Sequence, residues 1–149
     1  RPCGCGLRGC LERYSAGTAL GVNGWELAQF RPAYAARIIE LSGGNPEHIS
    51  GKAVTAAARE GDPAALECYE QLTHWLGVGL ADMCALLDPE VIVIAGGLAE
   101  AGDILLTPAR KAFNANLTAG THRPAIPVVL AEGGQEAGLV GAADLARQP

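Results

Sequence analysis

Three cysteines lie close together near the start of the chain and have the spacing of metal ligands. Cys3, Cys5 and Cys10 follow the pattern Cys-x-Cys-x4-Cys, with glycines at positions 4, 6 and 9 between them. Glycine adopts backbone angles that other residues avoid, so this loop can turn three sulfur atoms toward one point. Thiolates around a shared centre suit tetrahedral Zn²⁺. The spacing therefore predicts a structural zinc site that needs one further ligand.

A disulfide, or free thiols in a turn, are the alternatives to a metal site. A Cys3–Cys5 disulfide would be strained, because bridged Cα atoms normally lie roughly 5.5–6 Å apart and the loop is very short. The histidines are His48, His74 and His122, and none forms a short ligand-spaced pair with the cysteines. The fourth ligand is therefore expected upstream of residue 1, and the chain is expected to be the C-terminal part of a longer protein.

Glu12 is a candidate ligand for a sugar. It follows the last cysteine of the cluster by two residues, at the start of a predicted helix. A loop pinned by metal would hold the Glu12 carboxylate in one place, where it could accept hydrogen bonds from sugar hydroxyls. The alternative is a solvated carboxylate that is favoured by the helix dipole. No Ser-His-Asp or Cys-His arrangement stands out, and no candidate general base is found.

Gly96 and Gly97 form a candidate nucleotide site. They end a predicted strand, and a helix follows, which is where open α/β sheets bind nucleotides. Without side chains at these positions a ligand can approach the backbone, and a nearby helix N-terminus favours phosphate. The alternative is a tight strand-to-helix turn that binds nothing. Neither a Walker-type lysine motif nor a dinucleotide fingerprint follows this strand.

The elements that must position these groups are mostly helical. Apolar residues recur at spacings of three or four, and the predicted helices cover residues 11–21, 25–41, 51–60, 63–87, 107–117 and 136–147. Gly21 and Gly24 are expected to end the first helix, and Pro32 to kink or split the second. Asp62 and Pro63 form a capped helix start.

Two apolar segments, at about 91–95 and 125–131, read as parallel strands. The first is a continuous β-branched run, the pattern of a strand buried on both faces. Each strand is followed by a Gly-Gly pair and a helix, which predicts an α/β layered fold. A sheet usually needs three or more strands to be stable, so further strands are expected outside this chain.

Composition limits the class of protein. The chain has 149 residues, enough for one domain, of which 49% are apolar. Its net charge of −5 comes without a basic run, which argues against nucleic acid and membrane surfaces as partners. The apolar runs are too short to cross a membrane. Five cysteines, with Cys68 and Cys84 on predicted helix cores, fit a reducing cytoplasm better than a disulfide framework.

The cysteine segment resembles the zinc signature of the ROK family, which comprises repressors, open reading frames and sugar kinases. Residues 3–12 match its pattern Cys-x-Cys-Gly-x-x-Gly-Cys-x-Glu. Residues 88–97 resemble the segment before the family's adenosine site, and residues 137–143 resemble its C-terminal helix. Within the family the resemblance is greatest to ATP-dependent glucokinases of actinobacteria.

The resemblance implies an actin-like, ribonuclease H-like kinase of two lobes. The chain would be a C-terminal segment of the larger lobe, and the N-terminal lobe would be absent. Cys3, Cys5 and Cys10 would bind structural zinc together with an upstream histidine. Glu12 would bind the sugar, and the Gly-Gly pair at 96–97 the nucleotide.

The resemblance also implies an activity. The full-length protein would phosphorylate glucose at its 6-hydroxyl with ATP and Mg²⁺, as a cytoplasmic homodimer. The catalytic aspartate would lie upstream, so these 149 residues alone would be inactive. Two alternatives stay open, a sugar-responsive transcriptional repressor and a kinase for another hexose.

Overall fold

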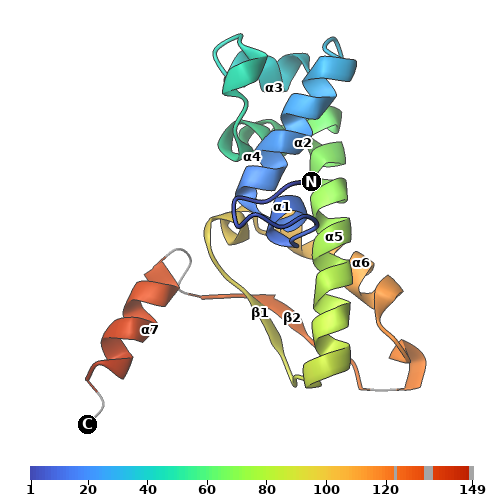
Figure 1. Ribbon diagram of the computed structural model, residues 1–149, viewed down its shortest axis with the longest axis vertical. Coiled ribbons are helices and arrows are strands. Elements are labelled where there is room, and N and C mark those ends of the chain that lie inside the picture. Colours follow the sequence, from blue (N-terminus) through green and yellow to red (C-terminus); the bar gives the residue numbers. More distant parts are fainter. Residues whose placement is uncertain (123, 133–135, 148–149) are drawn as a thin grey trace.

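The computed structural model describes residues 1–122, 124–132 and 136–147. The long helix α5 (Pro63–Leu87) runs along much of the molecule (Figure 1). The other elements, in chain order, are α1 (Glu12–Ser15), α2 (Gly17–Phe30), α3 (Ala36–Leu41), the 3-10 turn η1 (Pro46–His48), α4 (Gly51–Arg59), β1 (Ile92–Ile94), η2 (Gly97–Ala101), α6 (Asp103–Asn116), η3 (Gly120–His122), β2 (Val128–Leu130) and α7 (Ala137–Leu145). A helix-rich α/β architecture is thereby confirmed.

Both ends of α5 are set by the residues that predicted them. The Asp62 carboxylate accepts a hydrogen bond from the Ala65 N–H at 2.9 Å, and Pro63 occupies the first turn. At the other end Asp88 takes a left-handed conformation, with φ of 44°. Cys68 and Cys84 are buried core residues, as predicted. Despite the length of α5, no helix in the described part of the chain is both long and apolar enough to cross a membrane.

The prediction that Gly21 and Gly24 end a helix is wrong, because α2 continues through both to Phe30. Each glycine instead makes room for a neighbouring element. A Cβ on Gly24 would lie 2.7 Å from Cγ2 of Val54, and one on Gly21 would lie 3.0 Å from the backbone nitrogen of Gly51. The two glycines therefore allow α4 to pack closely on α2. Helix α2 stops just before Pro32, where the sequence predicted a break.

Helix α6 begins earlier than predicted. A start at Thr107–Pro108 was expected, but the helix runs from Asp103 to Asn116 with Pro108 inside it. An internal proline removes one backbone hydrogen bond and costs about 3 kcal/mol. The apolar face buried on both sides of Pro108 offsets this cost, since each buried large aliphatic or aromatic side chain contributes about 1.5–3 kcal/mol. That face consists of Leu105, Leu106, Ala109 and Phe113.

The two strands pair in parallel, as predicted, although both are shorter than expected. Ile92 pairs with Val128, and Ile94 with Leu130. Burial of the first strand on both faces is wrong for the described residues, because Val93 is 56% exposed. Ile92 and Ile94 pack instead toward the cluster formed by α5 and α6. The sheet is therefore covered on one face by the described part of the chain.

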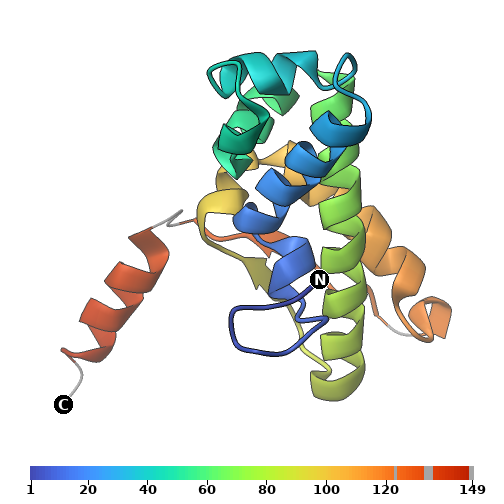
Figure 2. The same ribbon diagram turned by 45° about the horizontal axis from the view of Figure 1, so that its top comes forward.

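The C-terminal helix stands apart from the remaining elements. Figures 1 and 2 both show α7 beyond the sheet and away from α5. Its apolar side chains Leu139, Val140 and Leu145 are all more than 60% exposed. The Gly133–Gly134 turn that was predicted ahead of this helix lies outside the described residues.

Gly77 brings the backbones of α5 and α6 together. A Cβ at Gly77 would lie 2.6 Å from both the carbonyl carbon of Ala112 and the nitrogen of Phe113. Since backbone atoms cannot rotate away, we expect Gly77→Ala to lower the free energy of unfolding by about 1–3 kcal/mol. Denaturant unfolding measures this change.

The matched control is Gly141→Ala in α7, where a Cβ would meet nothing within 4 Å. Alanine is the better helix former by about 0.5–1 kcal/mol, so this variant should be neutral or slightly stabilised. Equal unfolding free energies for the two variants would contradict the close packing of α5 on α6.

Candidate functional site

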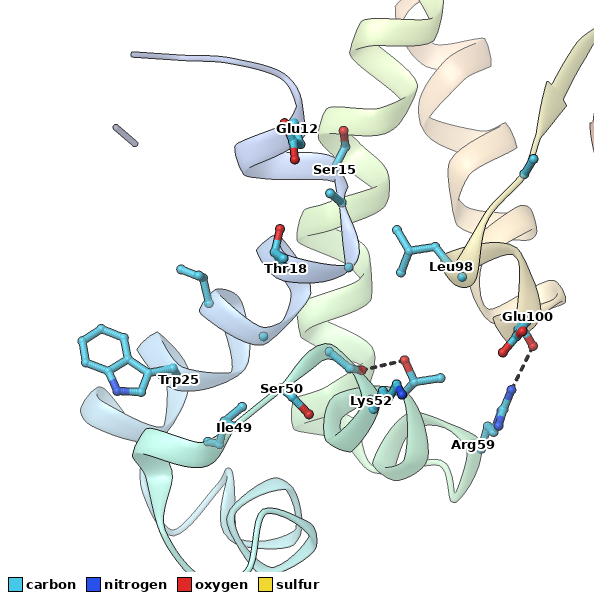
Figure 3. Close-up of a pocket in the computed structure, with 18 of the residues that line it drawn as sticks. Glu12, Ser15, Thr18, Trp25, Ile49, Ser50, Lys52, Arg59, Leu98 and Glu100 are labelled. Atoms are coloured by element: carbon cyan, nitrogen blue, oxygen red, sulfur yellow. Dashed lines mark hydrogen bonds between the residues drawn. The ribbon is translucent and has the colours of Figure 1, made fainter. Parts of the chain in front are cut away.

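An open cleft of about 1310 Å³ is lined by three separate segments of the chain. Figure 3 shows α1 and α2 on one side, α4 at the base and the turn after β1 on the other. Its lining includes Glu12, Lys52, Thr55, Arg59 and Gly97. Glu12 and Gly97, which the sequence singled out for separate reasons, therefore line the same cleft.

Glu12 is held at the cleft by the packing of its neighbour. Leu11 lies over Gly79 of α5, where an added Cβ would be 2.5 Å from Cδ2 of Leu11. Glu12 begins α1, and its side chain is exposed at the cleft (Figure 3). Within the described residues its carboxylate has no hydrogen bond or ion pair. An ionised carboxylate only accepts hydrogen bonds, so Glu12 is available to hydroxyl or N–H donors of a ligand.

The Gly96–Gly97 turn exposes backbone at the C-terminal end of β1. Gly96 has a φ of 88°, in the left-handed region that favours glycine, and its carbonyl accepts a hydrogen bond from Ala99. Gly97 lines the cleft directly. The turn leads through the short η2 into α6 rather than straight into a long helix. It thus leaves space where a ligand can approach the main chain.

The third wall, on α4, was not foreseen from the sequence. Lys52, Thr55 and Arg59 recur at helical spacing and line the cleft. The opposite face of the helix is buried and consists of Ala53, Val54, Ala57 and Ala58. Arg59 also donates a hydrogen bond to the Glu100 carbonyl at 2.9 Å, which ties α4 to the turn after β1. The alternation of faces was visible in the sequence, but its meaning depends on where α4 packs.

The structure brings the three predicted metal ligands together. The sulfur atoms of Cys3, Cys5 and Cys10 all lie within 4.8 Å of one another, and those of Cys5 and Cys10 are 3.6 Å apart. All three thiols are free. Sulfurs at the corners of a tetrahedral zinc site, with Zn–S bonds of about 2.3 Å, are separated by about 3.8 Å. The separation of the Cys5 and Cys10 sulfurs is close to that value.

Backbone hydrogen bonds hold the loop in this form. Cys3 donates to the Leu7 carbonyl at 2.9 Å, and Gly6 donates to the Cys3 carbonyl at 3.0 Å. Gly6 and Gly9 have φ values of 89° and 80°, where a side chain would be strained. The glycines between the cysteines therefore have the role that the sequence predicted.

The crowded sulfurs influence one another's ionisation. Hydrogen bonds with Cys5 and Cys3 raise the pKa of Cys10 to about 11, whereas a hydrogen bond with the Leu7 backbone lowers the pKa of Cys5. Three thiolates so close together need a cation to offset their repulsion. In the described part of the chain, no histidine, carboxylate or further cysteine joins this group as a fourth ligand.

The chain is similar to known proteins over its whole length. A family model described as ROK family matches residues 1–149. The chain is 44% identical over 147 residues to a glucokinase of Streptomyces coelicolor, a match that covers 99% of this chain and 46% of that protein. The chain thus spans about half the length of the curated relatives it matches.

Solved structures agree with this finding. A ROK family glucokinase from Streptomyces griseus in complex with glucose and AMPPNP matches with a TM-score of 0.94 and 44% identity, over 99% of this chain and 47% of that one. A ROK family transcriptional regulator, a homologue of the E. coli MLC protein, matches with a TM-score of 0.59 and 29% identity. This match covers 87% of this chain and 31% of the regulator. The expected actin-like fold class is confirmed. The chain belongs to the ROK family.

Proposed function

We propose that this chain is the C-terminal part of an ATP-dependent glucokinase, which transfers the γ-phosphate of ATP to the 6-hydroxyl of glucose. The observation that supports this most directly is the shared cleft, which has Glu12 on one wall and Gly97 on another. The S. griseus glucokinase, whose complex holds glucose and AMPPNP, has a closely similar fold across this chain.

In this proposal glucose and ATP bind to different walls of the cleft. The Glu12 carboxylate accepts hydrogen bonds from glucose hydroxyls, since it has no partner within the described residues. The turn at Gly96 and Gly97 lies against the nucleotide. Lys52 and Arg59 add positive charge to the cleft, which favours a polyphosphate.

The chemistry of phosphoryl transfer fits such a cleft. The reaction depends on positioning and on neutralisation of charge, which Mg²⁺ bound to ATP supplies. Holding both substrates in one cleft contributes through proximity and orientation. We place the catalytic base in the part of the protein that precedes this chain, so residues 1–149 alone are expected to be inactive.

We also propose that Cys3, Cys5 and Cys10 bind a structural zinc ion, with a fourth ligand from outside this chain. The free thiols and their separations support this assignment. The bound metal would stiffen the loop that leads into Glu12 and would have no direct part in phosphoryl transfer.

The proposal is tested with the purified full-length protein that contains this chain. ADP release is followed with glucose, mannose, fructose and N-acetylmannosamine as acceptors. Glucose is expected to give the highest kcat/KM, and residues 1–149 alone should give no turnover. A full-length protein that phosphorylates none of these sugars would refute the kinase assignment, and a preference for another sugar would refute glucose as substrate.

The second candidate is a sugar-responsive transcriptional repressor, which the match to a ROK regulator favours. Sugar-dependent binding to DNA without any kinase activity would support it. The greater identity to glucokinases, 44% against 29% for the regulator, argues against it. For either function we expect a cytoplasmic homodimer, whose mass sedimentation analysis would measure.

A further inference from the structure

Arg1 closes the base of the cysteine loop through its backbone. The Gly9 N–H donates a hydrogen bond to the Arg1 carbonyl at 3.1 Å. The next residue, Pro2, forms an antiparallel bridge with Arg8. The two ends of the loop are therefore joined at Arg1, just before the first cysteine.

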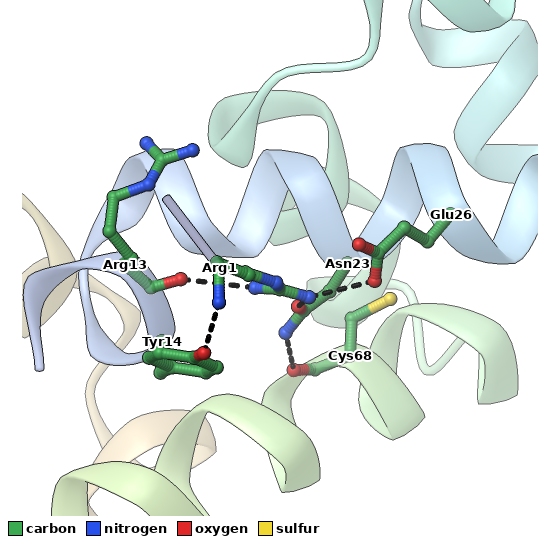
Figure 4. A network of polar contacts seen from close by, with 6 residues as sticks. All are labelled: Arg1, Arg13, Tyr14, Asn23, Glu26 and Cys68. Carbon is green, nitrogen blue, oxygen red and sulfur yellow. Dashed lines mark hydrogen bonds and ion pairs between the residues drawn. The ribbon is translucent and has the colours of Figure 1, made fainter. Parts of the chain in front are cut away.

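The Arg1 side chain then ties this loop to two helices (Figure 4). One terminal nitrogen donates to Asn23 Oδ1 at 2.8 Å and to Glu26 Oε2 at 2.7 Å, both on α2. The other terminal nitrogen donates to the Arg13 carbonyl at 3.1 Å. The guanidinium also lies 5.4 Å from the centre of the Tyr14 ring. With its side chain 20% exposed, Arg1 is far more enclosed than an ordinary surface arginine.

The partners of Arg1 are themselves fixed. Asn23 is 4% exposed, and its amide nitrogen donates to the Cys68 carbonyl of α5 at 3.2 Å. Tyr14 packs against Trp75 of α5, with ring centres 5.2 Å apart. A continuous set of contacts thus joins the core helix α5 to Arg1. The position of the guanidinium is therefore set by the core.

The bond to Arg13 matters because α1 is so short. A helix of four residues leaves its terminal carbonyls without intrahelical partners and cannot maintain itself. Arg1 supplies a charged donor to one of these carbonyls, at the favourable end of the helix dipole. Glu12 directly precedes Arg13, so the same bond restrains the backbone that presents the Glu12 carboxylate to the cleft.

We propose that Arg1 is a positioning residue for Glu12, one that holds α1 in place through its hydrogen bond to the Arg13 carbonyl. Glu12 is then restrained from both directions, by the cysteines before it and by the Arg1–Arg13 bond after it. The inference rests on the proposed function, in which Glu12 binds the sugar. Arg1 itself touches neither substrate.

The test is Arg1→Lys in the full-length protein. Lysine keeps the charge but lacks the planar fork that reaches Arg13, Asn23 and Glu26 together. We expect the KM for glucose to rise about tenfold, because small misplacements of a binding group cost that much or more. The KM for ATP should stay within about twofold, and the zinc content should not change. Arg8→Lys, in the same loop but without these side-chain bonds, should match the wild type.

A second measurement reports on Arg1 without an activity assay. Hydrogen exchange should be about tenfold faster in Arg1→Lys at the amides of Gly9 and of residues 13–15, with no change in the core of α5. Unchanged exchange at these amides, or loosened α1 with an unchanged KM for glucose, would overturn the inference. So would a loss of protection that extends through α5. If the wild-type protein phosphorylates no hexose, the proposed function fails, while exchange still decides whether Arg1 holds α1.

Discussion

Replacing Glu12 with glutamine is expected to lower kcat/KM for glucose by about 100-fold and to leave the KM for ATP nearly unchanged. Glutamine keeps the size of the side chain but removes its charge and turns one acceptor into a donor. Hydrogen bonds to charged groups contribute about 1.5–3 kcal/mol each, so losing one or two has an effect of this size. Steady-state kinetics with glucose and ATP varied separately measures both constants.

The folded protein should tolerate this change, because Glu12 has no protein partner among the described residues that it would lose. An unchanged melting temperature would show that the kinetic effect is local. Glu90→Gln, an exposed carboxylate outside the cleft, is the matched control and should behave as wild type. If the Glu12 variant kept the wild-type kcat/KM for glucose, Glu12 would not be a sugar-binding residue.

Replacing Cys5 with serine is expected to abolish zinc binding in the full-length protein. Wild-type protein should contain about one zinc per chain, and the variant close to none, because a serine hydroxyl is a far poorer zinc ligand than a thiolate. Structural zinc contributes directly to folding, so the melting temperature should fall by on the order of 10 °C. Elemental analysis and calorimetry measure the two effects.

Cys84→Ala is the matched control, since Cys84 is buried in the core and is not one of the three clustered cysteines. It should lose some stability through lost packing but keep its zinc. Zinc content should also fall on acidification, because each thiol must give up its proton to bind metal. Neighbouring Cys5 and Cys3 raise the pKa of Cys10 to about 11, so loss of its proton on metal binding is opposed more than for an ordinary thiol. A Cys5 variant with a full complement of zinc would contradict the site.

Features that depend on neighbours in sequence were predictable here. Helix α5 was placed at both ends because Asp62–Pro63 and Asp88–Pro89 act locally on the backbone. The same holds for the cysteine cluster, whose short loop and glycines restrict where the sulfurs can go. Glu12 and Gly97 were singled out for similar reasons, by their places directly after the loop and the strand.

Features set by distant parts of the chain were not predictable in this way. Gly21 and Gly24 would end an isolated helix, yet they are retained within α2 because α4 packs against them. Lys52 and Arg59 line the cleft only because that packing turns their face of α4 toward it. The exposure of Val93 likewise depends on which elements cover the sheet, and the strand's own residues do not determine that.

Two glycines of α5, two residues apart and on different sides of the helix, have a consequence for how relatives of this chain diverge. Gly79 receives Leu11, next to Glu12, and Gly77 receives the backbone of α6, which follows the Gly96–Gly97 turn by way of η2. Enlarging either position would displace one wall of the cleft relative to the other. Size at position 79 should therefore covary with size at position 11 across homologues, a bulkier residue at one being matched by a smaller residue at the other. Position 77 faces main chain instead of a side chain, so no neighbouring substitution can compensate for a larger residue there. Its residue type should therefore vary less among homologues than that at position 79.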